Sequence, residues 1–207
     1  GLDSAETRHS KLDQINRETI KDLGLEWHFE LGTKRGLEAT PLISEGVIYT
    51  TGTWSKVFAI DAVTGQLIWQ FDPEVPKEKG ANACCDVVNR GVALTKNAVF
   101  AGTIDGRLIS LDRSTGSVLW ETLTVNPSKP YTITGAPRVV GNKIIIGNGG
   151  AEYGVRGFIA AYDEITGQQI WKFFTVPGDP SKAHENEAMR MASKTWTGDV
   201  YWKTGGG

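Results

Sequence analysis

Residues 61–69 read Asp-Ala-Val-Thr-Gly-Gln-Leu-Ile-Trp, and the pattern returns at 112–120 as Asp-Arg-Ser-Thr-Gly-Ser-Val-Leu-Trp and at 163–171 as Asp-Glu-Ile-Thr-Gly-Gln-Gln-Ile-Trp. All three copies share an Asp, a Thr-Gly pair and a Trp at the same relative positions. The steps from Gly65 to Gly116 and from Gly116 to Gly167 are both 51 residues. A period kept this strictly predicts a fold built from repeated structural units.

Each period has room for four short strands. In the second period the strand-like runs are Gly91–Leu94, Ala98–Gly102, Arg107–Asp112 and Val118–Thr122. Turn-forming pairs such as Asp105-Gly106 separate them. A repeat of roughly 40–50 residues with four strands and a Trp is typical of a β-propeller blade. We therefore predict an all-β propeller of four-stranded blades, with repeats near residues 36–72, 87–123 and 134–174.

The repeated motif has a definite place in such a blade. The turn from the Asp to the Gly is expected to close the hairpin between the third and fourth strands. The Trp that follows, at the end of the fourth strand, is expected to dock between neighbouring blades. Three to four blades would leave a ring open at two edges. We therefore expect residues 1–207 to form part of a larger propeller domain, presumed to have eight blades.

The segments outside the repeats are predicted to hold little regular structure. Before the first repeat we expect a short helix from Arg17 to Leu23, capped by Asn16, and one further strand from Leu25 to Leu31 that carries Trp27. After the third repeat a polar insertion begins near Gly178. Within it, a short helix is expected from Glu185 to Ala192.

Composition excludes some classes of function. The chain has 22 Lys and Arg against 24 Asp and Glu, so it lacks the basic excess that binds nucleic acid. No apolar run reaches the roughly 20 residues needed to cross a bilayer, and the first residues do not resemble an export signal. We expect neither a nucleic-acid partner nor a membrane span in this chain.

The chain contains two cysteines, Cys84 and Cys85, and they are adjacent. A disulfide within the chain would therefore join neighbouring residues, in a strained geometry. The cysteines alone leave two interpretations open, a pair of separate thiols or a bonded pair that forms a rigid sulfur platform.

The segments around these cysteines resemble a known family. Four segments carry the resemblance: 37–41, Leu-Glu-Ala-Thr-Pro; 82–91, Asn-Ala-Cys-Cys-Asp-Val-Val-Asn-Arg-Gly; 131–137, Tyr-Thr-Ile-Thr-Gly-Ala-Pro; and 147–157, Gly-Asn-Gly-Gly-Ala-Glu-Tyr-Gly-Val-Arg-Gly. In order and spacing they are similar to the N-terminal portion of the propeller domain of alcohol dehydrogenases that depend on pyrroloquinoline quinone (PQQ). The resemblance covers nearly the whole chain.

The resemblance implies a set of cofactor contacts. A disulfide between Cys84 and Cys85 would cover one face of PQQ, and Arg90 would pair with its quinone or carboxylate edge. The other implied contacts are the Thr134 hydroxyl, the Glu38 carboxylate and the backbone amides of Gly150 and Ala151. Glu152 would bind the metal, which is expected to be Ca²⁺ with a lanthanide as the alternative.

The resemblance also implies an activity for the parent protein. Primary alcohols would be oxidised to aldehydes by hydride transfer to the quinone, and the electrons would pass to a cytochrome, in the periplasm. The catalytic general-base Asp, an Asn ligand of the metal and a Trp opposite the sulfur pair are expected beyond Gly207, as is any haem c. The chain itself would contain no catalytic residue and, alone, would be inactive.

Other interpretations compete with this one. A propeller can serve as a non-enzymatic scaffold for protein–protein interaction, and dehydrogenases of sugars or aldehydes can use the same cofactor. Two further features point to no site. His9, His28 and His184 share no ligand spacing, and the glycines at 205–207 lack the Lys-Ser/Thr of a phosphate-binding loop.

Overall fold

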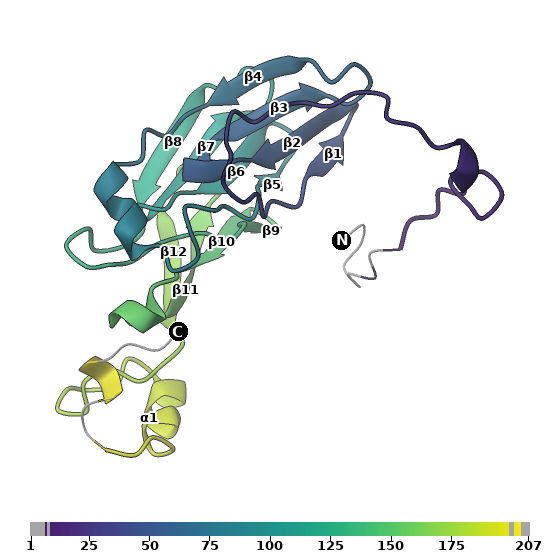
Figure 1. Ribbon diagram of the computed structural model, residues 1–207. Coiled ribbons are helices and arrows are strands. Elements are labelled where there is room, and N and C mark those ends of the chain that lie inside the picture. Colours follow the sequence, from purple (N-terminus) through teal and green to yellow (C-terminus); the bar gives the residue numbers. More distant parts are fainter. Residues whose placement is uncertain (1–6, 8, 199–200, 204–207) are drawn as a thin grey trace.

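The structure, a computed structural model, describes residue 7, residues 9–198 and residues 201–203. Three antiparallel sheets of four strands each follow one another along the chain (Figure 1). The first contains β1 (Leu42–Ser44), β2 (Val47–Thr51), β3 (Val57–Asp61) and β4 (Leu67–Phe71). The second contains β5 (Ala93–Leu94), β6 (Ala98–Gly102), β7 (Arg107–Asp112) and β8 (Val118–Leu123). The third contains β9 (Arg138–Val140), β10 (Lys143–Gly147), β11 (Phe158–Asp163) and β12 (Gln169–Phe174).

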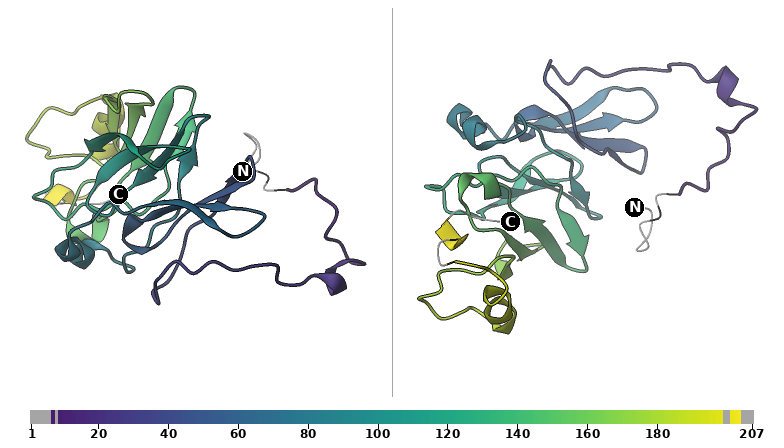
Figure 2. Two further views of the ribbon diagram at one scale, coloured as in Figure 1. Left: turned by 90° about the horizontal axis from the view of Figure 1, so that it is seen from above. Right: turned by 60° about the horizontal axis from the view of Figure 1, so that its bottom comes forward.

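Each sheet is an up-and-down meander, in which every strand pairs with the next one along the chain. The sheets lie face to face and fan out from one another, as the two views of Figure 2 show. The predicted all-β propeller of four-stranded blades is therefore confirmed. The number of blades in a closed ring stays a prediction.

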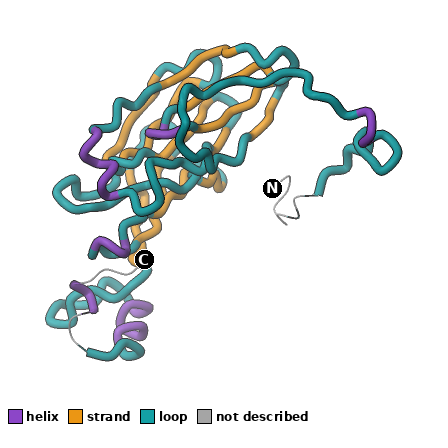
Figure 3. The backbone as a smooth tube through the Cα atoms, in the orientation of Figure 1, coloured by secondary structure: helices purple, strands orange, loops and turns teal. Residues whose placement is uncertain are grey.

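Helices are short and lie outside the sheets. They are η1 (Ile20–Asp22), η2 (Thr53–Ser55), η3 (Lys77–Asn82), η4 (Ala151–Tyr153), η5 (Tyr201–Lys203) and the single α-helical segment among the described residues, α1 (Glu187–Ser193). Figure 3 shows that the strands gather in one body, whereas the segments before β1 and after β12 consist mostly of loops. None of the helices in the described part of the chain is long and apolar enough to cross a membrane.

The core lies between the blades. One cluster fills the space between the first and second sheets and includes Tyr49, Val57, Val99 and Ile109; a second lies between the second and third sheets and includes Phe100, Leu108, Ile144, Phe158 and Tyr162. The middle sheet has a blade on each face, so all five residues of β6 are buried. Burial of each large apolar side chain contributes about 1.5–3 kcal/mol, which makes these contacts the main source of cohesion between blades.

The repeated Asp-x-x-Thr-Gly motif forms the same turn in all three blades. In the first blade Asp61 Oδ1 accepts hydrogen bonds from the backbone N–H of Val63 and Thr64 and from the Thr64 hydroxyl. Gly65 follows in the left-handed region, with φ +71°. Hydrogen bonds from the Thr64 backbone and hydroxyl lower the pKa of Asp61. The motif thus closes the hairpin between the third and fourth strands, as predicted.

The Trp of each of the first two motifs contacts the turn of the next blade. Trp69 Nε1 donates to the carbonyl of Arg113 at 3.0 Å, and Trp120 Nε1 donates to the carbonyl of Glu164 at 2.9 Å. The Trp69 ring also lies against Gly116, where a Cβ atom would be 2.7 Å from it. The predicted docking of Trp between blades is confirmed for Trp69 and Trp120, although each lies within its strand rather than at its end.

The segment before the first blade differs from expectation. Leu25–Leu31 is not a strand, because the described residues offer its backbone no neighbouring strand to pair with. Trp27 nevertheless donates to the carbonyl of Ala62 at 3.3 Å, the same contact that Trp69 makes one blade later. Trp27 therefore occupies the docking position of a preceding blade.

The two predicted helices are also corrected. In the first, Asn16 does accept hydrogen bonds from the backbone of Glu18 and Thr19, but only Ile20–Asp22 forms a 3-10 turn. Its residues are all exposed, so no tertiary packing stabilises a longer helix. The second helix spans Glu187–Ser193 rather than 185–192, because the Asn186 side chain caps its N-terminus.

We predict that Gly116→Ala destabilises the propeller. The new Cβ would collide with the Trp69 ring in a backbone of φ +73°. We expect the free energy of unfolding to fall by about 1–3 kcal/mol from overpacking. It should fall further, by about 1–2 kcal/mol, because alanine disfavours the left-handed region. Urea unfolding of the complete gene product, followed by Trp fluorescence, measures the loss. The control is Gly141→Ala, which has φ +59° but no atom within 4 Å of its Cβ, so equal losses would contradict this account.

Candidate functional site

Loops from the second and third blades converge on one cavity of about 280 Å³. Its walls come from three stretches: residues 84–90, after η3; residues 132–134, before β9; and residues 148–152, after β10. The cavity brings together seven of the eight predicted site residues, Cys84, Cys85, Arg90, Thr134, Gly150, Ala151 and Glu152.

The eighth predicted residue, Glu38, lies against the cavity through Arg90. Arg90 Nη2 pairs with Glu38 Oε2 at 2.8 Å, while Arg90 Nη1 donates to Thr134 Oγ1 at 2.7 Å. Both charged side chains are about two-fifths exposed, so their pairing contributes little to stability. Its effect is to hold the guanidinium in a fixed direction at the cavity edge.

Arg90 is positioned by the buried residue that precedes it. Asn89 is 2% exposed, and its side-chain amide donates to the carbonyl of Gly102 at 2.8 Å. Its side-chain oxygen accepts from Gly91 N at 3.0 Å, and its backbone carbonyl accepts from the Thr51 hydroxyl. The first two blades therefore anchor the chain beside Arg90.

The two cysteines lie at the cavity with their sulfur atoms 2.6 Å apart. The structure has both as free cysteines, so the disulfide stays a prediction. Hydrogen bonds to Cys85 and then to Glu152 raise the pKa of the Cys84 thiol to about 12. The pKa of Glu152 is lowered, first by a hydrogen bond from its own backbone amide and then by the Cys84 thiol. An anionic carboxylate thus lies next to the sulfur pair.

The glycine-rich loop turns close to the backbone of its neighbour. Gly150 has φ +102°, and a Cβ there would lie 2.6 Å from the carbonyl oxygen of Pro130. Gly149 N donates to the carbonyl of Thr132 at 2.7 Å. Only glycine allows this approach, which places Ala151 and Glu152 on the turn η4 at the cavity wall.

Five lining residues were not singled out from the sequence, namely Asp86, Val88, Thr132, Asn148 and Gly149. All of them lie inside the segments that carry the family resemblance. Asn148 shapes the glycine loop, because its Oδ1 accepts from Phe158 N at 2.7 Å and its Nδ2 donates to the carbonyl of Gly149. Asp86 pairs with Arg35, from the segment before the first blade. Their position in those segments was the one sequence feature that could have identified them as site residues.

The described residues supply only part of a metal site. Among them, no three His, Cys, Asp or Glu side chains gather to hold an ion. Glu152 offers one exposed carboxylate, which suits a hard divalent cation. Of the histidines, His9 and His28 are exposed, while His184 Nε2 lies 3.4 Å from the Ser193 hydroxyl. The glycines at 205–207 lie outside the described residues.

The described residues form a β-propeller segment whose loops enclose a cavity lined by polar side chains and a glycine-rich turn. The model of the PQQ glucose/ethanol/alcohol dehydrogenase β-propeller domain matches residues 1–204, and the chain belongs to this family. It is 57% identical over its whole length to the quinohemoprotein alcohol dehydrogenase ADH IIB of Pseudomonas putida. It is 52% identical, over 95% of its length, to the 1-butanol dehydrogenase (cytochrome c) of Thauera butanivorans.

The chain is also similar, in fold and in sequence, to a protein of known structure. The crystal structure of the quinohemoprotein alcohol dehydrogenase of Comamonas testosteroni matches all of this chain and 31% of its own, with a TM-score of 0.95 and 53% identity. The chain spans 30% of the Pseudomonas protein and 28% of the Thauera protein. It therefore corresponds to somewhat less than a third of each of these proteins.

We predict that Cys84 resists alkylation in the reduced protein. Because its thiol pKa is raised to about 12, the reactive thiolate is scarce at pH 8. Glu152→Gln removes a negative charge and a charged hydrogen-bond acceptor, so the rate of Cys84 alkylation by iodoacetamide should increase severalfold. Mass spectrometry of the peptide measures the rate from pH 7 to 10. Glu78→Gln, an exposed change on η3, is the control and should match the wild type.

Proposed function

We propose that this chain forms one side of the cofactor site of a PQQ-dependent alcohol dehydrogenase. The complete protein would oxidise primary alcohols to aldehydes and pass the electrons to a cytochrome. One observation carries the proposal: the sulfur pair, Arg90, Thr134 and Glu152 line a single cavity in a chain whose relatives are alcohol dehydrogenases. These relatives favour an enzyme over a binding scaffold.

The residues at the cavity fit the cofactor. PQQ is a flat quinone with three carboxylates, and when bound it supplies a two-electron acceptor. Arg90 offers a cation and several N–H donors to an anionic edge, and Thr134 offers a hydroxyl. The paired sulfurs offer a face without charged groups, and Gly150 lets the loop pass close to Pro130, which brings Ala151 and Glu152 to the cavity wall. These residues bind and orient the cofactor.

Glu152 is proposed to hold the metal. Its lowered pKa keeps the carboxylate anionic, as a ligand of Ca²⁺ must be. The other carboxylate that lines the cavity, Asp86, is paired with Arg35, so the remaining ligands would come from the cofactor and from parts of the protein outside this chain. Ca²⁺ is the proposed ion, with a lanthanide as the alternative. The general-base Asp is likewise proposed to lie outside the chain.

The sulfur pair bears on the cellular compartment of the protein. We infer that Cys84 and Cys85 form a vicinal disulfide in the mature enzyme, which would replace two thiols by a rigid platform under the cofactor. Disulfides persist in oxidising compartments, which supports a periplasmic location. The names of two relatives, a quinohemoprotein alcohol dehydrogenase and a 1-butanol dehydrogenase (cytochrome c), support a haem in the complete protein and a cytochrome as acceptor.

Reconstitution of the complete gene product tests the function. The apoprotein would be loaded with PQQ and CaCl₂ and assayed with 1-butanol and an artificial electron acceptor. Loss of a residue that only hydrogen-bonds a metal ligand typically weakens metal binding by roughly 10–100-fold. Glu152→Gln removes the ligand itself, so it should weaken Ca²⁺ binding by more than that. It should abolish oxidation at low Ca²⁺, while Glu78→Gln should behave as wild type. A wild-type protein that binds no PQQ would refute the proposal.

A further inference from the structure

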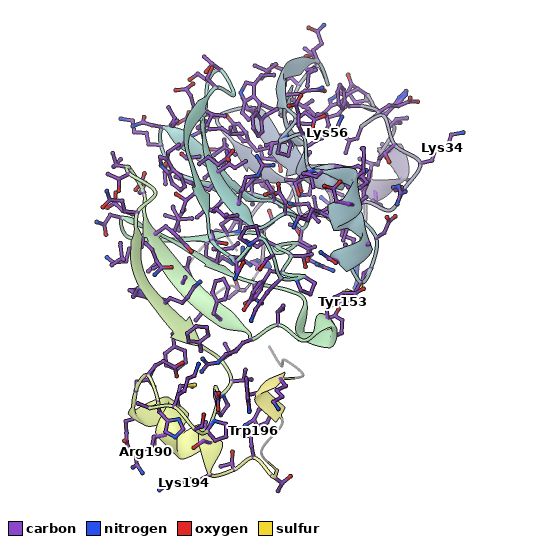
Figure 4. All side chains as sticks on the ribbon, turned by 90° about the vertical axis from the view of Figure 1, so that its left-hand side faces the viewer. Lys34, Lys56, Tyr153, Arg190, Lys194 and Trp196 are labelled. Carbon is purple, nitrogen blue, oxygen red and sulfur yellow. The ribbon has the colours of Figure 1, made fainter. Side chains whose placement is uncertain are left out.

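Glu152 lies on a short turn that has few contacts of its own. The turn η4 is bounded by two residues in the left-handed region, Gly150 with φ +102° and Gly154 with φ +78°, and it contains no buried residue. Figure 4 labels Tyr153 at the end of this turn, on the side of the propeller from which the segment with α1 extends. Besides its hydrogen bond with the Cys84 thiol, the position of the Glu152 carboxylate depends on how the chain is anchored on both sides of the turn.

The side preceding the turn is anchored within the third blade. Gly149 exchanges backbone hydrogen bonds with Thr132, and the Asn148 side chain bridges to Phe158 N. On the other side Val155 is 1% exposed, and its backbone N–H donates to the carbonyl of Gly150. This buried residue connects the turn directly to Arg156.

Arg156 is held by an unusually complete set of contacts. Its Nη1 and Nη2 bind the two carboxylate oxygens of Glu185 at 2.5 and 3.1 Å, and its Nε donates to the carbonyl of Val176 at 2.8 Å. The guanidinium lies 3.9 Å from the centre of the Phe174 ring. Only 18% of the Arg156 side chain is exposed. Such a bidentate, stacked arginine has a single well-defined position.

Glu185 comes from the segment that follows the third blade. It lies 29 residues after Arg156 in the sequence and immediately before Asn186, the capping residue of α1. The ion pair therefore fastens the segment after β12 to the chain just beyond η4. In Figure 4 Arg190 and Lys194 mark α1 in this segment, outside the body of sheets.

From these contacts we propose that Arg156 and Glu185 form a clasp that positions Glu152 for metal binding. The clasp rests on the proposed function, since it acts through the metal that Glu152 would hold. Neither residue lines the cavity of the sulfur pair, so both act as positioning residues. Removing the clasp would let η4 and its carboxylate move and would weaken the metal site without removing a ligand.

The test compares two neighbouring glutamates in the complete gene product. Glu185→Gln keeps the shape of the side chain but removes the charge that pairs with Arg156. Glu187→Gln makes the same change two residues later, in an exposed pair with Arg190. Ca²⁺ affinity is measured by calorimetric titration of the apoprotein with CaCl₂ in the presence of PQQ. We expect affinity to fall about tenfold in Glu185→Gln and to stay unchanged in Glu187→Gln.

A second variant separates positioning from stability. Arg156→Lys keeps a charge beside Glu185 but loses the bidentate fork and the bond to Val176, so it should also weaken Ca²⁺ binding. The unfolding midpoint of the metal-free protein should change little in either clasp variant. Wild-type Ca²⁺ affinity in both clasp variants would overturn the clasp alone, as would equal losses in Glu185→Gln and Glu187→Gln. A wild-type protein that binds neither PQQ nor Ca²⁺ would overturn the clasp together with the proposed function.

Discussion

The contact on which the rest of the structure depends joins a motif Trp of one blade to the turn of the following blade. The indole N–H of Trp69 or Trp120 finds a backbone carbonyl in that turn, and its ring covers the glycine that closes it. The Asp of the motif fixes the turn by accepting hydrogen bonds from backbone N–H groups, so local contacts shape the surface on which the Trp docks. The turn of the middle motif thus binds the Trp of the blade before it, and the Trp of the same motif binds the turn of the blade after it. Because the motif recurs every 51 residues, successive sheets pack on one another in the same way.

Regular blades allow irregular loops to build a site. Between β4 and β5, between β8 and β9, and between β10 and β11 the chain leaves its sheet, and these three excursions supply the cavity. Buried groups such as Asn89 hold these loops in place, because the Asn89 side-chain amide donates to Gly102 of the second blade and its backbone carbonyl accepts from Thr51 of the first. The site is therefore polar and accessible, while its support is buried and rigid, as ligand binding to a preformed pocket requires.

The site has a positive charge at one edge of the cavity and a negative charge at another. Arg90 is directed by Glu38 and Thr134 towards one edge of the cavity, and Glu152 lies at another, beside the sulfur pair. A ligand with both an anionic rim and a metal-binding oxygen satisfies both groups, which is the chemistry that PQQ and a hard cation would bring together.

Several features could be predicted from the sequence because they depend on residues close together in the chain. The blade repeat, the hairpin turn and the docking Trp all follow from a local motif, and four short segments carried the resemblance to a family. The failures share one cause. Within the described residues, Leu25–Leu31 has the pattern of a strand but no strand to pair with, and the helix predicted after Asn16 has no surface to pack on. Likewise, Asn89, Asn148 and the pair of Arg156 with Glu185 acquire their roles from partners distant in sequence. Local propensity sets what a segment can become, whereas contacts made only on folding decide what it does become and which side chains meet at the site.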